Sequence, residues 1–196
     1  MEYPIDARNK VKRIPKRGHY DRATVYEILD AAFLCHVGFS VDNQPFVIPT
    51  SYGRDGDVLY LHGATTSRMM VELAKGLPVC LTVTHLDGLV LARSTFHHSM
   101  NYRSAVVFGT ARLIEGDEKM KGLEVITENI LKGRWAESRQ PIAKEMKATT
   151  VLRVDIEQAS AKIRTGGPGD EKADYALPIW AGVVPIQQVY GQPIDD

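Results

Sequence analysis

Leu59-Tyr60-Leu61-His62-Gly63-Ala64-Thr65-Thr66-Ser67-Arg68 is the stretch in which a strand pattern changes into a helix pattern. Helical spacing continues from Arg68 to Lys75, and Gly76 follows as a glycine does after a helix C-terminus. Backbone N–H groups at a helix start, together with hydroxyl and guanidinium groups, favour binding of a phosphate or carboxylate. The stretch therefore predicts an anion site. The alternative is that Ser67 is an ordinary N-cap and Arg68 a solvated residue.

The residues before this stretch predict a helix and an antiparallel meander. Asp21 is a candidate N-cap for a helix over 22–32, whose apolar residues recur on one face. Strand patterns follow over 33–41, 46–52 and 58–62. Turn residues at 42–45 and 54–57 separate them, and Asp-Gly between apolar runs is a strong hairpin signal.

The residues after it continue the strand pattern. Val79 to Thr84 alternate, Asp87-Gly88 predicts a turn, and strands are expected over 89–96 and 104–114. A helix from Asp117 to near Gly133 and a strand over 149–156 complete the pattern. Six to seven antiparallel strands with peripheral helices predict an α+β fold closed into a small β-barrel, since closure removes exposed strand edges.

The chain of 196 residues is expected to form a single domain, 1–196. An N-terminal arm covers about 1–20. A tail over about 165–196 is predicted to be irregular, because it holds Gly166-Gly167-Pro168-Gly169 and three further prolines. Its apolar residues suggest that the tail packs against another surface, either of this chain or of a partner.

Composition excludes several function classes. Lys+Arg and Asp+Glu are both 24, so no overall field draws the chain to nucleic acid or to an acidic membrane. No apolar run approaches the roughly 20 residues of a membrane span, and the N-terminus lacks the pattern of a secretion signal. We expect a cytoplasmic protein in which Cys35 and Cys80 are free thiols.

The order of these segments resembles the FMN-binding proteins of the pyridoxamine 5′-phosphate oxidase-like family, in particular the branch of nitroimidazole-resistance reductases. The resemblance extends from about Arg13 to Ile186. The segments that carry it are Phe46–Tyr52, Tyr60–Ala64 with Ser67-Arg68, Tyr102–Gly109, Gly133-Arg134-Trp135 and Leu177–Pro185.

The resemblance implies a split barrel that forms a homodimer with two FMN molecules at the subunit interface. It implies that one strand lines the flavin ring, that the next strand ends beside it, and that the anion site holds the phosphate. A later strand and the tail add further contacts. The implied cofactor-binding residues are Val47, Ile48, Pro49, Thr50, His62, Gly63, Thr66, Ser67, Arg68, Arg103, Ser104 and Trp180.

Two features depart from the family pattern: the residue after the arginine of the phosphate motif, and the C-terminal segment, where this chain has Trp180-Ala181-Gly182-Val183-Val184-Pro185 in place of a Trp segment with an Arg-Leu-Xaa-Pro-like pattern. The vitamin B6 phosphate oxidases have a lysine after the arginine of the phosphate motif, whereas this chain has Met69, so the resemblance does not extend to that substrate. The sequence also lacks a nucleophile elbow, a Walker loop and the Cys-Xaa-Xaa-Cys type of metal-ligand spacing. A flavin would supply the electron chemistry itself. We therefore expect an FMN-dependent oxidoreductase for a small molecule, with NAD(P)H as a candidate electron donor, no metal site and no assigned catalytic side chain.

Two alternatives remain open. A haem-binding or haem-degrading protein could use the same barrel, with His62 or His98 as candidate ligands, and His97-His98 are expected in a loop. A non-enzymatic flavin carrier is the other. His36 and His85 fall within strands and are expected to be structural.

Overall fold

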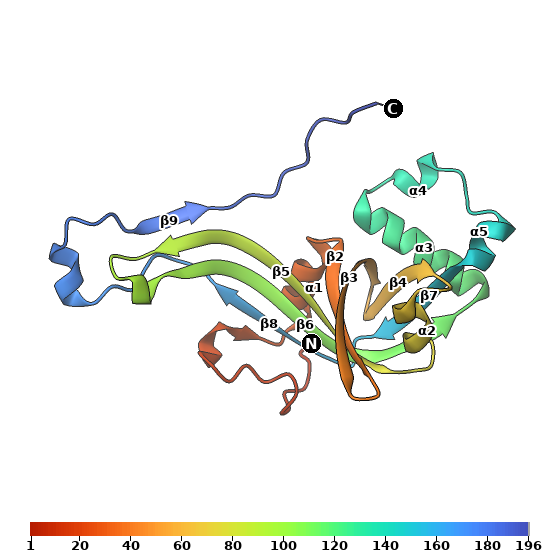
Figure 1. The fold of residues 1–196 in the computed structure, drawn as a ribbon, viewed down its shortest axis with the longest axis horizontal. Coiled ribbons are helices and arrows are strands. Elements are labelled where there is room, and N and C mark those ends of the chain that lie inside the picture. The colour runs from red at the N-terminus through yellow and green to blue at the C-terminus, as the bar shows by residue number, and fades with distance from the viewer. Residues whose placement is uncertain (196) are drawn as a thin grey trace.

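The nine strands form one antiparallel system, and six of them close into a ring (Figure 1). The computed structural model describes residues 1–195, and Asp196, the end of the predicted tail, lies outside the described residues. The strands are β1 (Gly18–His19), β2 (Leu34–Val41), β3 (Gln44–Asp55), β4 (Val58–Ala64), β5 (Pro78–Leu91), β6 (Ser99–Ile114), β7 (Thr149–Asp155), β8 (Gln158–Arg164) and β9 (Gly182–Pro185).

The ring runs β6-β7-β4-β3-β2-β5 and closes because β5 also pairs with β6. The expected split barrel is confirmed. Three strands lie outside the ring: β8 on β6, β1 on β8, and β9 on β5. Sequence reading missed β1, which has two residues, and β9, which lies in the glycine- and proline-rich tail, because both depend on pairing with a distant strand.

The first hairpin turn is tighter than predicted. Val41 pairs with Gln44, so Asp42 and Asn43 alone make the turn, with φ of 49° and 63°. Asp and Asn tolerate this left-handed region better than most residues, and two such residues match the twist of a hairpin.

The predicted turn at Asp87-Gly88 is wrong. Strand β5 continues through it, and only a register shift between Leu86 and Gly88 marks the place. Asp87 accepts two hydrogen bonds from the Arg103 guanidinium of β6, at 3.0 and 2.9 Å, so its carboxylate is used across the ladder rather than in a turn. The hairpin instead closes through the 3-10 helix η2 (Thr95–His97), which places His97-His98 in a connection, as expected.

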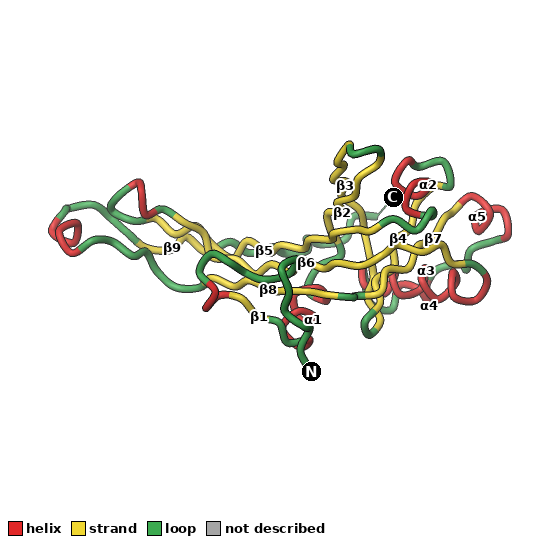
Figure 2. Tube along the Cα trace, turned by 90° about the horizontal axis from the view of Figure 1, so that it is seen from below, coloured by secondary structure: helices red, strands yellow, loops and turns green. Residues whose placement is uncertain are grey.

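Strands β5 and β6 are therefore long enough to leave the barrel. Their far halves, with β9, form an arm that extends well away from the barrel and its helices (Figure 2). We call residues 86–102 and 165–185 the arm. The tail contributes the 3-10 helix η3 (Lys172–Ala176) to the arm, and Asp170 forms an ion pair with Arg93 at 2.9 Å.

Helices cover the barrel. In α1 (Arg22–Asp30) the Asp21 side chain accepts a hydrogen bond from the Thr24 N–H, which confirms the N-cap. The other helices are α2 (Arg68–Leu73), α3 (Gly116–Ile130), α4 (Arg134–Glu137) and α5 (Ala143–Ala148). Helix α3 crosses β3 so closely that a Cβ on Gly53 would stand 2.6 Å from the Val125 backbone.

The core fills the ring and continues under α1. It contains Leu59 and Leu61 of β4, Val37 of β2 and Leu81 of β5, all fully buried. The predicted N-terminal arm packs on this body, since Tyr3 is buried. Cys35 is buried and Cys80 half-buried, and both are free thiols. None of the helices in residues 1–195 has the length and apolar character that a membrane span requires.

Candidate functional site

Strand β3 offers an open edge over its first half. Residues 44–51 pair with β2, whereas pairing with β4 begins only at Tyr52 and continues to Asp55. Among the described strands, none pairs with the other edge of 44–51. Every second residue there leaves its backbone groups free for another partner, although Pro45 and Pro49 offer only a carbonyl because proline has no N–H.

The four predicted residues of this strand alternate between two faces. Val47 and Pro49 point outward, and the Val47 side chain is 69% exposed. Ile48 packs against the core instead. Thr50 is half-buried, and its carbonyl accepts a weak hydrogen bond from the Cys35 thiol at 3.6 Å. Val47 and Pro49 can therefore present side chains to a ligand, whereas Ile48 can contribute only backbone groups.

The predicted anion site lies beside this strand. The Arg68 guanidinium stands over the Phe46 ring, 5.2 Å from its centroid, directly before Val47. Arg68 and Thr66 are exposed, and no carboxylate among residues 1–195 pairs with Arg68. The structure thus brings Arg68 together with Phe46 of β3.

Ser67 occupies the N-cap position of α2, but its side chain makes no capping hydrogen bond. Its hydroxyl is therefore available to another partner. The turn is fixed by its backbone, because the Thr65 N–H donates to the Ala148 carbonyl at 3.1 Å and the Ser67 N–H to the Ala64 carbonyl at 2.9 Å. Met69, where the family's B6 oxidases have a lysine, is buried in the core, so a charge there would be desolvated.

Gly63 and His62 have different roles. A Cβ on Gly63 would lie 3.0 Å from the Met70 side chain, so the small residue lets α2 pack against β4. His62 alternates with the core residue Leu61 and shares the outer face of β4 with Tyr60. Its Nδ1 is buried and has no hydrogen-bond partner among the described residues. Burial lowers the pKa of His62, which keeps the imidazole neutral at pH 7.

Arg103 and Ser104 lie where the arm begins. Arg103 pairs with His85 of β5 across the ladder. Strand β5 begins at Pro78, after α2, and His85 lies seven residues further along it. At about 3.3 Å per residue this separates Arg103 from the α2 end of the barrel by roughly 20 Å. The Arg103 guanidinium is held by Asp87, and Ser104 Oγ donates to the Lys162 carbonyl at 3.4 Å.

Trp180 lies on the arm. It precedes β9, which pairs with Gly88–Leu91 of β5, and its ring packs where a Cβ on Gly182 would stand. The indole is 63% exposed. Within one chain the structure does not bring Trp180 together with Arg68, so its predicted contact with the cofactor stays a prediction.

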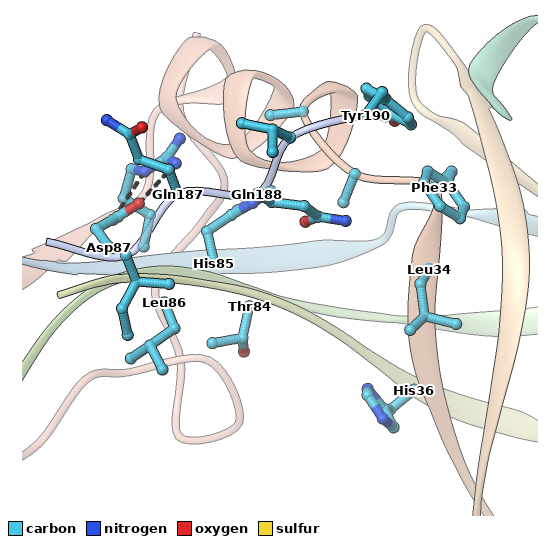
Figure 3. A pocket seen from close by; sticks show the side chains of 15 residues that line it. Phe33, Leu34, His36, Thr84, His85, Leu86, Asp87, Gln187, Gln188 and Tyr190 are labelled. Atoms are coloured by element: carbon cyan, nitrogen blue, oxygen red, sulfur yellow. Dashed lines mark hydrogen bonds and ion pairs between the residues drawn. The ribbon is translucent and has the colours of Figure 1, made fainter. Parts of the chain in front are cut away.

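The structure also contains a cavity that the sequence did not indicate. It measures about 940 Å³ and lies between β2, β5, the end of α1 and the tail (Figure 3). Its lining includes Arg103, His36 and His85, and the tail residues Gln187 and Gln188. His85 is structural, as expected, because its Nε2 hydrogen-bonds the Ile28 carbonyl at 2.9 Å. His36 is exposed.

A closed six-stranded ring with an extended hairpin and a helix at one mouth defines a split-barrel protein. The chain belongs to the pyridoxamine 5′-phosphate oxidase family, whose members match residues 21–163. A search of curated proteins gave no match.

The solved structures that resemble it include the following three. Flavocytochrome Anf3 from Azotobacter vinelandii is 42% identical, with a TM-score of 0.89 over 97% of this chain and 89% of that one. The FAD and haem binding protein from Mycobacterium smegmatis is 39% identical, with a TM-score of 0.88 over 92% and 89%. A putative 5-nitroimidazole antibiotic resistance protein from Bacteroides thetaiotaomicron is 25% identical, with a TM-score of 0.63 over 74% and 86%. The expected likeness to nitroimidazole-resistance proteins is confirmed, and the other two proteins are more similar in sequence.

Proposed function

We propose that this protein binds a flavin nucleotide along the open edge of β3 and transfers electrons to or from a small molecule. The observation that carries the proposal is the Arg68 guanidinium, which pairs with no carboxylate among residues 1–195 and stands over Phe46, in the strand that also presents exposed Val47 and Pro49. The flavocytochrome and the FAD and haem binding protein, both about 40% identical, support a flavin.

In this proposal each group of the site has one task. Arg68 and the hydroxyls of Thr66 and Ser67 bind a phosphate, and free backbone groups of Val47–Thr50 orient the ring. When bound, the flavin supplies hydride or electron transfer. The half-buried side chains of Phe46 and Ile48 pack against the core and cover one side of the strand.

The sequence favours FMN, whereas one relative is described as an FAD-binding protein. Both nucleotides carry the phosphate that Thr66–Arg68 would bind. Absorption spectroscopy of the purified protein, followed by mass spectrometry of the released chromophore, identifies the nucleotide. A colourless protein that retains neither added FMN nor added FAD would overturn the proposal.

Arg68→Glu tests the phosphate site. Loss of a charge-assisted contact and introduction of like charge should weaken flavin binding roughly 10- to 100-fold, measured by quenching of flavin fluorescence. Arg13→Glu is the matched control, because it makes the same charge change at another exposed arginine and should leave affinity unchanged. Unchanged affinity in Arg68→Glu would show that the phosphate lies elsewhere.

The proposal includes a homodimer with the flavin at the interface. Its support is the exposed outer face of β2 and β3, where Leu34 and Val47 are unpartnered in one chain, and the apolar surface of the arm. Light scattering should give about twice 21.8 kDa for the flavin-loaded protein. Turnover with NADH or NADPH would separate an oxidoreductase from a flavin carrier.

Haem binding is a second candidate, favoured by His62. A neutral imidazole with a buried, unpartnered nitrogen is a group that could ligate iron, and two relatives are described as a flavocytochrome and a haem-binding protein. Added haemin should give a Soret band that His62→Ala abolishes. His98→Ala should retain it, because His98 Nδ1 already accepts the Ala92 N–H at 3.0 Å.

A further inference from the structure

The cavity of about 940 Å³ exists because two ring strands part. Strand β2 pairs with β5 only between His36–Gly38 and Cys80–Thr82. Beyond Thr82, β5 continues into the arm, while β2 begins at Leu34 after the end of α1. The resulting fork lies beside the proposed flavin strand, since His36 is paired with Pro49 of β3.

The chain's own tail covers one side of this fork. Residues 186–190, which we call the strap, line the cavity opposite β5 (Figure 3). The strap is tied at its start, where the Ile186 N–H donates to the Asp87 carbonyl at 3.1 Å. Its far end is loosely held, because Tyr190 is 76% exposed. A cavity closed by a segment anchored at one end can admit and retain a ligand.

The lining has no uncompensated charge. Within the described chain the lining contains one acidic and one basic residue, Asp87 and Arg103. The Arg103 guanidinium donates two hydrogen bonds to the Asp87 carboxylate, so the two charges pair with each other. A ligand with an acid group, including the propionates of haem, finds no free cation there. Leu34, Leu86 and Val189 supply apolar surface, so the lining suits a neutral and mainly apolar molecule.

Further hydrogen-bond donors complete the lining. In Figure 3 the Gln188 amide points from the strap into the gap between β5 and β2, whereas the Gln187 amide points away from that gap. The Gln188 NH₂ can donate to an oxygen acceptor, and the His36 ring lies near the edge of the same fork. A flat molecule with carbonyl oxygens would use these donors while its rings contact the apolar wall.

We propose that the fork binds a neutral quinone, which accepts electrons from the adjacent flavin, and that the strap closes over it. This inference rests on the proposed function. The quinone would gain two electrons and two protons, all supplied by the reduced flavin, and would leave as the hydroquinone. The roles of Gln188 and the strap concern binding, which is measurable without turnover.

The test is calorimetric titration of the flavin-loaded protein with menadione. Two analogues separate the contributions of charge and carbonyl groups. 1,4-Naphthoquinone-2-sulfonate should bind at least tenfold more weakly than menadione, because the fork offers no free cation to pair with its sulfonate. 2-Methylnaphthalene should also bind more weakly than menadione, because it has no carbonyl oxygen to accept a hydrogen bond.

Variants of the strap test the site itself. Deletion of residues 186–196 keeps β9 and should weaken menadione binding at least tenfold. Gln188→Ala should weaken it roughly three- to tenfold through one lost hydrogen bond. Gln192→Ala, the control at an exposed tail glutamine outside the cavity lining, should change it by less than twofold. Gln188→Ala changes one tail side chain, so it decides the question if the deletion impairs folding.

The outcomes distinguish the two proposals. Menadione affinity that is absent, or equal in wild type and Gln188→Ala, with flavin retained, overturns the quinone site and leaves the flavin proposal intact. Haemin that displaces menadione, or the sulfonate analogue binding as tightly as menadione, would overturn the inference that the fork binds a neutral ligand. Failure to retain flavin overturns the proposed function.

Discussion

The two halves of the β5–β6 hairpin have nearly the same strand geometry and opposite environments. In the barrel half, Leu81 is 1% exposed because the ring encloses it, whereas in the arm Leu89 is 42% exposed. The same alternation of apolar residues thus contributes to a core in one half and leaves an apolar surface in the other. Stability is expected to come from the barrel, and contacts with ligands or a second chain from the arm and fork.

Substitution of a glycine in the barrel should lower the free energy of unfolding more than substitution of a glycine in the arm. A Cβ at Gly109 would stand 2.3 Å from the Asp155 carbonyl, which is backbone and cannot move without opening the ring. Gly109→Val should cost about 3 kcal/mol or more in free energy of unfolding. Gly88→Ala in the arm meets the Val184 carbonyl at 3.0 Å, and β9 can shift, so about 1 kcal/mol is expected. Urea unfolding measures both, and equal losses would contradict the distinction.

Side-chain truncation sharpens the same contrast. Leu81→Ala should cost about 2–5 kcal/mol in urea unfolding, because it removes fully buried atoms and leaves a cavity. Leu89→Ala should cost less than about 1 kcal/mol in the isolated chain, because its side chain is already partly solvated. A large loss for Leu89→Ala would show that the arm is part of the folding core.

Acid should weaken the contacts between the barrel and the N-terminal residues 1–20. Burial alone would raise the pKa of Asp57, but hydrogen bonds from Tyr26 and Tyr3 and the charge of Arg22 outweigh it and hold this pKa below its usual value. A depressed folded pKa stabilises the fold above the unfolded value, about 3.9, and the contribution is lost as pH falls through the folded pKa. The melting temperature of Asp57→Asn should therefore lie below wild type at pH 6, and the difference should shrink below pH 4. A constant difference would contradict this role.

Much of the fold is predictable because its signals are local. The Asp21 cap, the Asp42-Asn43 turn and the alternation of Val79, Leu81 and Val83 each depend on neighbours within a few residues. The Asp87-Gly88 turn failed for the converse reason. Its residue types suit a hairpin, but Arg103, sixteen residues away, bonds the carboxylate and keeps the strand extended.

The site shows the same division. The hydroxyl-rich turn ending in Arg68 was visible in sequence, because helix start and anion-binding residues are adjacent. That Ser67 leaves its hydroxyl unused, that Phe46 places Arg68 beside β3 and that His62 has a buried unpartnered nitrogen all follow from packing. The fork cavity has no sequence signal, since its lining joins the end of α1, β5 and the strap.

The sequence by itself determined most of the strands and turns, the neutral charge and the position of the anion-binding turn. The strands and turns follow from backbone preference and period over a short window, and the charge follows from composition. Tertiary structure alone decided that β5 pairs with both β2 and β6, that the two long strands leave the ring as an arm, and that the tail returns over the fork. Those features depend on contacts between residues up to about 150 positions apart, whose free energy comes from burial and pairing that no local pattern encodes.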